Sequence, residues 1–338
     1  MSDVTVPART AGEAGSGDPV EPAVLDRAVQ VGAFRYPVLV RVGTAASGAL
    51  TEHVRGLAAD RRCALVAGPG VSARQLGEVT AALEPLAPGG PAGGVLVAVG
   101  GRATLRRALA TAGTAPVVLV PTTLGAMCGA SVLVRGDAAT GRPRAPALVW
   151  CRPDLLDGPQ HGGLFPVLRD VLAICPYFYD SVAARLRPDG RYDPATLAAF
   201  VALCVEAQSG VLGYDPLGRG PGAVLRYGAG RAAGLLLAAR VARRLGLLGE
   251  ADADAHRRLV AAAGLSTAEQ VWPDRAGTLV LLEALGRPHV CAGSLLTPVG
   301  PFGSGPGTGT GPAHDTAPVP LGHQDADRGR HETAAAAR

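Results

Sequence analysis

The side chains available for chemistry in this chain are arginine, histidine, cysteine and carboxylate groups, because lysine is absent. All 32 basic residues are arginine, which stays protonated and therefore serves neither as a Schiff base nor as a tunable general base. No two histidines stand four residues apart, and no Gly-x-Ser-x-Gly sequence marks a serine nucleophile. The sequence therefore favours binding and catalysis by charge, hydrogen bonds and shape.

Two glycines lie where an apolar run passes into a helical pattern. Residues 94–101 read as a buried strand, and the residues up to Ala110 favour a helix. Glycine at such a turn lets the backbone approach a phosphate group, and the helix N-terminus offers unpaired amide groups. Gly100 and Gly101 are therefore candidates for a nucleotide site. The alternative is an ordinary turn between a strand and a helix.

Short apolar runs alternate with helical patterns in the first half of the chain, which is typical of a parallel sheet covered on both faces. We expect strands over 36–42, 63–67, 94–101 and 117–120, and a helix over 72–83. After residue 151 the pattern changes to helices, which we expect over 164–173, 195–211, 232–245, 251–263 and 279–285.

These patterns predict an α/β fold of two domains. An N-terminal Rossmann-like parallel-sheet domain is expected at 35–151 and a mostly helical C-terminal domain at 152–299. Gly- and Pro-rich composition predicts a disordered arm at 1–34 and a disordered tail at 300–338. The cleft between the two domains is the expected ligand site.

Composition also limits the partners. A net charge of +4 without basic runs interleaved with aromatics argues against nucleic-acid binding. The N-terminus does not resemble a signal peptide, and we expect no membrane-spanning segment. The six cysteines include no Cys-x-x-Cys pair and are expected to be reduced and buried. We therefore expect a cytoplasmic protein.

Two segments carry a resemblance to a known family. Residues 117–127, Val-Val-Leu-Val-Pro-Thr-Thr-Leu-Gly-Ala-Met, and residues 227–248 resemble 3-dehydroquinate synthase and its sugar-phosphate cyclase relatives. The resemblance runs from about Tyr36 to about Arg287. It implies a dehydroquinate synthase-like fold, with NAD, a divalent metal and several lysines acting on a phosphorylated sugar acid. It also places Thr122 and Thr123 beside the nucleotide, next to Gly100 and Gly101.

The chain departs from the family pattern at the positions that carry its chemistry. Two metal-ligand positions fall on Asp170 and Tyr227, and two lysine positions fall on Arg135 and Gln208. The Gly-Asp that follows the family's glycine-rich turn is missing after Gly101. The resemblance therefore predicts a divergent homologue without cofactors: zinc is not expected, and NAD binding is at best weak.

The residues left at the family's site are an acid, a phenol, guanidinium groups and an amide. We expect catalytic roles for Asp170, Tyr227, Arg231, Arg135 and Gln208, which together could hold an anionic or enol-type oxygen. As partners, the resemblance implies a small-molecule biosynthetic intermediate, with a homodimer or a cyclase partner subunit as further options. Three functions remain open. The first is a repurposed metal- and NAD-independent enzyme of specialised metabolism, of cyclisation or elimination type. The second is a catalytically silent partner subunit of an active cyclase, and the third is a true sugar-phosphate cyclase with an eroded site.

Overall fold

The computed structural model describes residues 25–43, 46–58, 62–88, 94–130, 135–136, 143–266 and 278–292. Contacts group Met1–Leu295 into one unit, so the sheet half and the helical half described below lie in the same unit. The second unit, Leu296–Arg338, lies outside the described residues. The expected division into domains at residue 151 stays a prediction.

A seven-stranded sheet with the order β1-β2-β9-β6-β5-β3-β4 forms the N-terminal half. β1 and β2 pair antiparallel, and the remaining pairs are parallel. The central strands β5 and β6 are Val-rich runs buried along their whole length, as a sheet covered on both faces requires. The strands are β1 (Leu25–Val31), β2 (Phe34–Val40), β3 (Arg62–Ala67), β4 (Ala87–Pro88), β5 (Val95–Gly100), β6 (Val117–Pro121) and β9 (Leu148–Cys151). A separate pair joins β7 (Arg135–Gly136) to β8 (Pro143–Arg144).

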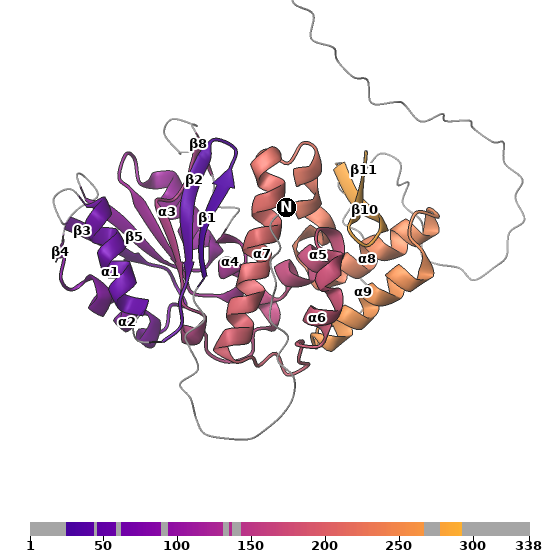
Figure 1. Ribbon diagram of the computed structural model, residues 1–338, viewed down its shortest axis with the longest axis horizontal. Coiled ribbons are helices and arrows are strands. Elements are labelled where there is room, and N and C mark those ends of the chain that lie inside the picture. Colours follow the sequence, from indigo (N-terminus) through magenta and orange to yellow (C-terminus); the bar gives the residue numbers. More distant parts are fainter. Residues whose placement is uncertain are drawn as a thin grey trace, which may run out of the picture. The chain divides into compact units, whose positions relative to one another are not determined.

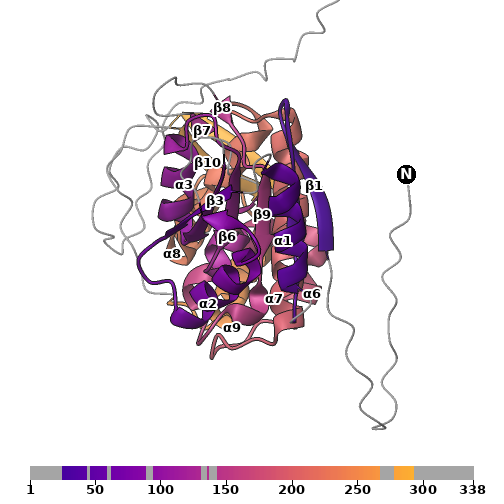
Figure 2. The same ribbon diagram turned by 90° about the vertical axis from the view of Figure 1, so that its left-hand side faces the viewer.

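Helices cover both faces of this sheet. Figure 2 shows α1 (Ala46–Leu57) and α3 (Arg102–Thr111) on opposite sides of the strands. α2 (Ala73–Leu83) begins with a capping box, in which Ser72 Oγ accepts from Gln75 N and the Gln75 side chain accepts from Ser72 N. A short helix, α4 (Leu124–Met127), follows β6. The parallel α/β class that the sequence predicts is confirmed.

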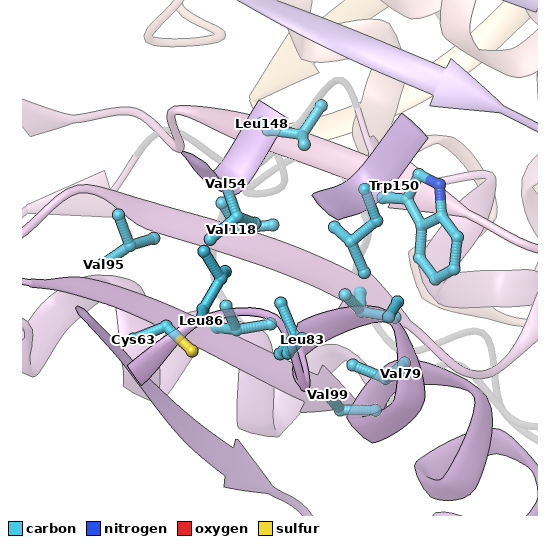
Figure 3. Packing of buried hydrophobic residues seen from close by; sticks show 14 of the residues in the cluster. Val54, Cys63, Val79, Leu83, Leu86, Val95, Val99, Val118, Leu148 and Trp150 are labelled. Atoms are coloured by element: carbon cyan, nitrogen blue, oxygen red, sulfur yellow. The ribbon is translucent and has the colours of Figure 1, made fainter. Parts of the chain in front are cut away.

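The core between α1, α2 and the strands is built from Val, Leu and Ala, with one large aromatic side chain (Figure 3). Val54 of α1 and Val79 and Leu83 of α2 pack with Val99 of β5 and Trp150 of β9, and all are buried. Branched aliphatic side chains fill this layer because the chain has few aromatic residues, 4% in total.

Helices dominate the C-terminal half, and Figure 1 shows α7 between the sheet and the other helices. Asp193 begins α7 by accepting a hydrogen bond from Thr196 N at 2.8 Å. The helices are α5 (Phe165–Ala173), α6 (Tyr179–Ala183), α7 (Pro194–Tyr214), α8 (Ala232–Arg244) and α9 (Glu250–Ala262), with short 3-10 helices η2 (Pro153–Leu155), η3 (His161–Gly163), η4 (Pro176–Phe178) and η5 (Pro221–Gly230). The helices predicted around 164–173, 195–211, 232–245 and 251–263 are confirmed.

Two boundaries differ from the sequence prediction. The helix expected over 279–285 is strand β10 (Thr278–Ala284), which pairs with β11 (Arg287–Ala292) across a turn at Gly286 with φ +72°. A seven-residue apolar run has no period that separates a strand from a helix. The arm expected up to residue 34 is also too long, because β1 starts at Leu25. Val29 and Val31 of β1 are buried, and the polar residues of this strand are exposed.

One helix bears on the expectation about membrane-spanning segments. α7 is long and apolar enough to cross a membrane by length and composition, with a mean hydropathy of 1.6 over its best window. It contacts β1, β2 and α5, and Leu197, Phe200, Val201 and Leu212 of its sequence are buried in the fold. Its apolar character is accounted for by packing within the protein.

Candidate functional site

A hollow of about 250 Å³ lies where residues of the sheet half and the helical half meet. Its polar side chains are three arginines and one glutamine, and the remaining lining is apolar or glycine. We call this hollow the arginine pocket. It is lined by Val31, Arg102, Gly129, Pro166, Arg169, Gln208, Leu212, Pro216, Leu217, Gly218, Gly222, Leu225 and Arg226.

Arg169 of α5 lines the pocket and binds Asp170. Its Nε donates to Asp170 Oδ1 at 2.7 Å, and its Nη2 lies 2.6 Å from the same oxygen. Nη1 donates to the carbonyl of Leu225 at 3.1 Å, and the guanidinium carbon lies 5.8 Å from the ring centre of Phe165. The Arg169 side chain is 8% exposed and Asp170 is fully buried. A buried ion pair is therefore held by several partners, as its desolvation requires.

Gln208 of α7 completes this network. Its Nε2 donates to Asp170 Oδ2 at 2.7 Å and to the carbonyl of Cys128 at 2.9 Å. Both carboxylate oxygens of Asp170 thus accept hydrogen bonds from the protein. Gln208 Oε1 is buried and has no hydrogen-bond partner.

Thiols surround the same carboxylate. Cys175 Sγ donates to the carbonyl of Asp170 at 3.3 Å. Burial raises the pKa of Asp170, and the charge of Arg169 with hydrogen bonds from Gln208 and Cys204 opposes that rise. Burial, with the nearby Asp170 charge, raises the pKa of Cys175 to about 12, and burial also raises the pKa of Cys204. These thiols are protonated at neutral pH, so they do not act as nucleophiles.

The loop between α7 and η5 forms another wall of the arginine pocket. Asp215 fixes this loop, because its carboxylate accepts from the backbone N–H groups of Arg219, Gly220 and Gly222 at 3.1, 2.6 and 2.9 Å. Arg226 returns a hydrogen bond from Nη2 to the carbonyl of Gly218 at 2.9 Å. Side-chain and backbone bonds together therefore position Arg226 at the pocket.

The two candidate glycines, at the turn between β5 and α3, have different structural roles. A Cβ at Gly100, whose φ is +156°, would lie 2.9 Å from Thr104 Cβ, so this glycine is required by packing within the turn. Gly101 precedes α3 without a side-chain cap, and a Cβ there would meet nothing within 4 Å. Arg102, the first residue of α3, lines the arginine pocket. The open helix N-terminus suits a phosphate group at Gly101 and Arg102.

The two threonines of the Pro-Thr-Thr segment differ in their structural roles. Thr123 begins α4, and its Oγ1 accepts from Ala126 N at 3.3 Å. Thr122 is buried, and its carbonyl accepts from Gln75 Nε2 at 3.2 Å. Thr122 N also donates to the carbonyl of Gly100, which ties this segment to the glycine turn.

Tyr227 contacts a histidine on a neighbouring helix. Its hydroxyl lies 2.8 Å from His256 Nε2, and His256 Nδ1 lies 2.7 Å from the carbonyl of Asp252. Nδ1 therefore carries the proton, and the phenol donates to Nε2. Tyr227 and His256 are fully buried. The phenol thus has its partner on α9, after a kinked backbone at Tyr227–Ala229, and it does not line the arginine pocket with Gln208. Its expected catalytic role stays a prediction.

The remaining predicted catalytic residues lie apart from this network. Arg231 precedes α8, is exposed and does not line the arginine pocket. The guanidinium that pairs with Asp170 is that of Arg169. Arg135 lies on β7, but its side chain, like Ser131, lies outside the described part of the structure. Of the five predicted catalytic residues, Asp170 and Gln208 are therefore brought together.

Sequence reasoning missed Arg169, Arg102 and His256. Arg169 has one available signal, since a charged residue inside an otherwise apolar helix needs a buried partner. His256 stands three and four residues before the buried Leu259 and Val260, which places it on the inner face of its helix. Arg102 follows directly after the glycine pair. For Arg169 and His256, the signal lies in the helix that carries the residue and not in the residue type alone.

A second hollow, of about 540 Å³, lies between α8 and α9. Arg240, Arg243, Arg244 and Arg257 line it together with alanine and leucine. Arg243 and Arg257 form ion pairs with Glu250 and Asp254. None of the predicted site residues lines this hollow.

Comparison with known proteins relates the chain to cyclases. No family model matches it. The 2-deoxy-scyllo-inosose synthase of Streptomyces lividus is 32% identical over 248 residues, which cover 64% of this chain and 57% of that protein. The enzyme of the same name from Streptomyces fradiae is 36% identical over 137 residues, 35% of this chain and 31% of that protein. The chain thus spans about half, or less, of the length of these relatives.

Solved structures share the fold. A 2-deoxy-scyllo-inosose synthase complexed with carbaglucose-6-phosphate, NAD⁺ and Co²⁺ matches with a TM-score of 0.66 at 19% identity, covering 78% of this chain and 94% of that one. The 2-epi-5-epi-valiolone synthase of Streptomyces hygroscopicus subsp. jinggangensis 5008, with NAD⁺ and Zn²⁺, matches with a TM-score of 0.61 at 14% identity, covering 79% and 95%.

These complexes overturn the expectation that the protein works without cofactors, because both proteins of the same fold bind NAD⁺ and a divalent metal. The open N-terminus of α3 fits a phosphate of NAD⁺. The residues around Asp170 do not fit a metal ion, since both of its oxygens are occupied by Arg169 and Gln208. Within the described ranges, no group of three His, Cys, Asp or Glu side chains could hold one.

Sequence and fold agree on the relationship. The matched segments reach across both halves of the structure, and the solved relatives share the arrangement of sheet and helices. The chain is therefore related in sequence to 2-deoxy-scyllo-inosose synthase, and it shares the fold of the solved 2-deoxy-scyllo-inosose synthase and 2-epi-5-epi-valiolone synthase.

Proposed function

We propose that the protein is an enzyme of secondary-metabolite biosynthesis that binds a phosphorylated, hydroxylated small molecule in the arginine pocket and catalyses a cyclisation or an elimination. The observation that carries this proposal is the lining of the pocket by Arg102, Arg169 and Arg226 with no carboxylate among the lining residues. Guanidinium groups bind phosphate oxygens through two parallel N–H donors. The relative complexed with carbaglucose-6-phosphate supports the same class of ligand.

The network behind the pocket supports a catalytic function. Asp170 and the carbonyl of Leu225 hold the guanidinium of Arg169 in one orientation. A fixed donor of this kind stabilises negative charge that develops on a substrate oxygen, because no reorganisation is needed during the reaction. Asp170 acts here through Arg169 and is a positioning residue.

NAD⁺ is the cofactor that we propose for this site. Its phosphates would lie at the amide groups of Gly101 and Arg102, at the N-terminus of α3. When bound, NAD⁺ supplies hydride transfer. The protein's own contribution at that point is the open backbone at Gly101 and the charge of Arg102.

Calorimetric titration with carbaglucose-6-phosphate in the presence of NAD⁺ tests this function. We expect the wild-type protein to bind, and Arg226→Gln or Arg102→Gln to weaken binding by about tenfold or more, because a charge-assisted hydrogen bond is lost. Arg191→Gln, an exposed arginine outside the pocket, is the control. Absence of binding to the wild-type protein, or equal affinities in all variants, would contradict the proposal.

A silent partner subunit is the second candidate, and one observation favours it. Asp170 has both oxygens paired within the protein, so it has no free oxygen to exchange a proton with a substrate. In that case the protein should raise the activity of a co-expressed cyclase, and Arg226→Gln should leave that increase unchanged. Loss of the increase in Arg226→Gln would instead favour the enzyme. The cytoplasmic location that composition predicts stays a prediction.

A further inference from the structure

The amide of Gln208 has a fixed orientation. Two acceptors, Asp170 Oδ2 at 2.7 Å and the carbonyl of Cys128 at 2.9 Å, face one end of the group. If the amide oxygen of Gln208 lay at that end, it would face two other acceptor oxygens without a hydrogen between them. The NH₂ group must therefore lie there. Oε1 therefore points away from Asp170, and its position follows from the network and not from a free choice of rotamer.

Oε1 is left as an unmatched acceptor on a side chain that lines the arginine pocket. The Gln208 side chain is fully buried, lines the pocket, and has no partner for this oxygen. The other polar side chains that line the pocket are Arg102, Arg169 and Arg226, which only donate hydrogen bonds. Among the described lining side chains, Gln208 is therefore the one amide acceptor beside three cations.

We infer that Gln208 Oε1 accepts a hydrogen bond from a hydroxyl group of the bound ligand, and that it selects ligands with a hydroxyl donor at that point. The inference rests on the proposed function for the phosphate that brings the ligand to the arginines. It adds a second requirement to the ligand: beside the phosphate, which accepts hydrogen bonds from the arginines, a hydroxyl group must donate a hydrogen bond to Gln208. An amide oxygen that is buried without a donor is unfavourable, so the ligand hydroxyl restores a missing bond.

Fluorine provides a probe that separates donation from size. Replacing a hydroxyl with fluorine keeps nearly the same volume and removes the proton that could be donated. A ligand with fluorine at the selected position leaves Oε1 unpaired in the complex. We therefore expect one monodeoxyfluoro analogue of glucose 6-phosphate to bind the wild-type protein about tenfold to a hundredfold more weakly than glucose 6-phosphate, while the other isomers bind nearly as well.

Gln208→Lys removes the acceptor and keeps the donors. A lysine ammonium can donate to Asp170 and to the Cys128 carbonyl, as the amide does, but it accepts no hydrogen bond. We expect this variant to bind glucose 6-phosphate and the weak-binding fluoro analogue with equal affinity, within about twofold. Gln160→Lys is the matched control, because Gln160 Nε2 also donates to two carbonyls, of Asp157 and Gly158, and does not line the pocket.

Isothermal titration of the full-length wild-type protein and both variants, with each analogue and with inorganic phosphate, gives the result. The inference is overturned if every fluoro analogue binds the wild-type protein as tightly as glucose 6-phosphate, as a water molecule on Oε1 would allow. It is also overturned if the discrimination persists in Gln208→Lys. The series on the wild-type protein can overturn the inference even if that variant does not fold. Failure of glucose 6-phosphate itself to bind would instead refute the proposed function and the inference together.

Discussion

Arg169 and Asp170 are neighbours in the chain and still form an ion pair, although adjacent residues of a helix do not face each other. The pairing is possible because Asp170 lies near the end of α5 and the arginine reaches back along the helix surface. Arg169 also donates to the carbonyl of Leu225 and lies over the ring of Phe165, and Asp170 accepts a hydrogen bond from Gln208. The pair thus links α5 to α7 and η5, the elements that surround the arginine pocket.

Breaking this pair should destabilise the protein strongly. Arg169→Met leaves the buried Asp170 without its cation, and we expect a loss of about 3–5 kcal/mol in the free energy of unfolding measured with urea. The double variant Arg169→Met with Asp170→Leu should recover most of that loss, since both charges are then absent. Arg185→Met, at an exposed position, should change stability by less than about 0.5 kcal/mol. A single variant as stable as the wild type would contradict this account.

His256 should make stability depend on pH. Burial lowers the pKa of His256 below its ordinary value of 6.5, so the folded protein keeps the ring neutral while the unfolded chain takes up a proton. The stabilising contribution is therefore present above about pH 6.5 and is lost as the pH falls below that value, with a slope of up to about 1.4 kcal/mol per pH unit. Urea unfolding across pH 5 to 8 measures it.

His256→Gln should remove this dependence, because the glutamine oxygen can still accept from Tyr227 and does not titrate. His53→Gln is the matched control, since His53 also bonds the carbonyl four residues before it, of Ala49, on α1. An unchanged slope in His256→Gln would show that another group is responsible.

At the scale of elements, the contact between α3 and the ends of β3 and β5 is closer than side chains normally allow. A Cβ at Gly68 would overlap the hydroxyl of Thr104, and a Cβ at Gly100 would lie 2.9 Å from Thr104 Cβ. Thr104 therefore occupies a recess made by two glycines that come from different strands. This recess brings the first turn of α3, with Arg102, to the arginine pocket.

Filling the recess should destabilise the fold. We expect Gly68→Ala to lower the free energy of unfolding by about 1–3 kcal/mol, because the added methyl group must push α3 away from the sheet. Adding Thr104→Ala should restore part of the loss by removing the overlapping hydroxyl. Gly101→Ala, where nothing lies within 4 Å, should leave stability nearly unchanged while weakening NAD⁺ binding in a calorimetric titration. Equal stability of the Gly68 and Gly101 variants would refute the steric explanation.

On the scale of the whole molecule, the sequence predicted the sheet because Val-rich runs between helical patterns have few other solutions. It predicted Asp170 and Gln208 together because the family resemblance placed two separate segments at one site. It did not predict the contact of Tyr227 with His256, which depends on a backbone kink at Gly228, with φ +71°, and on the packing of α9. It also failed at β10, where a short apolar run carries no period. Pairings such as Arg169 with Asp170 depend on tertiary packing, which composition and spacing do not contain.

Contacts between the two halves should make them unfold together. Gly32 N donates to the carbonyl of Leu212 at 3.4 Å, and Gln208 of α7 donates to the carbonyl of Cys128 at the end of α4. Trp150 is buried in the sheet, so its fluorescence reports on that half, while far-ultraviolet circular dichroism is dominated by the helices. In a Trp272→Phe variant we expect both signals to change at the same urea concentration. Two separate transitions would instead support independent domains.

Five buried cysteines are distributed over the described parts of both halves. Cys63, Cys128, Cys151, Cys175 and Cys204 are free thiols shielded from solvent, and burial raises the pKa of Cys151, Cys175 and Cys204. An alkylating reagent can modify such a thiol only after the surrounding structure opens, so the labelling rate of each cysteine reports the free energy of its local opening. Because these residues lie in β3, β9, α7 and beside α4 and α5, the unaltered protein carries natural reporters of opening in both of its halves.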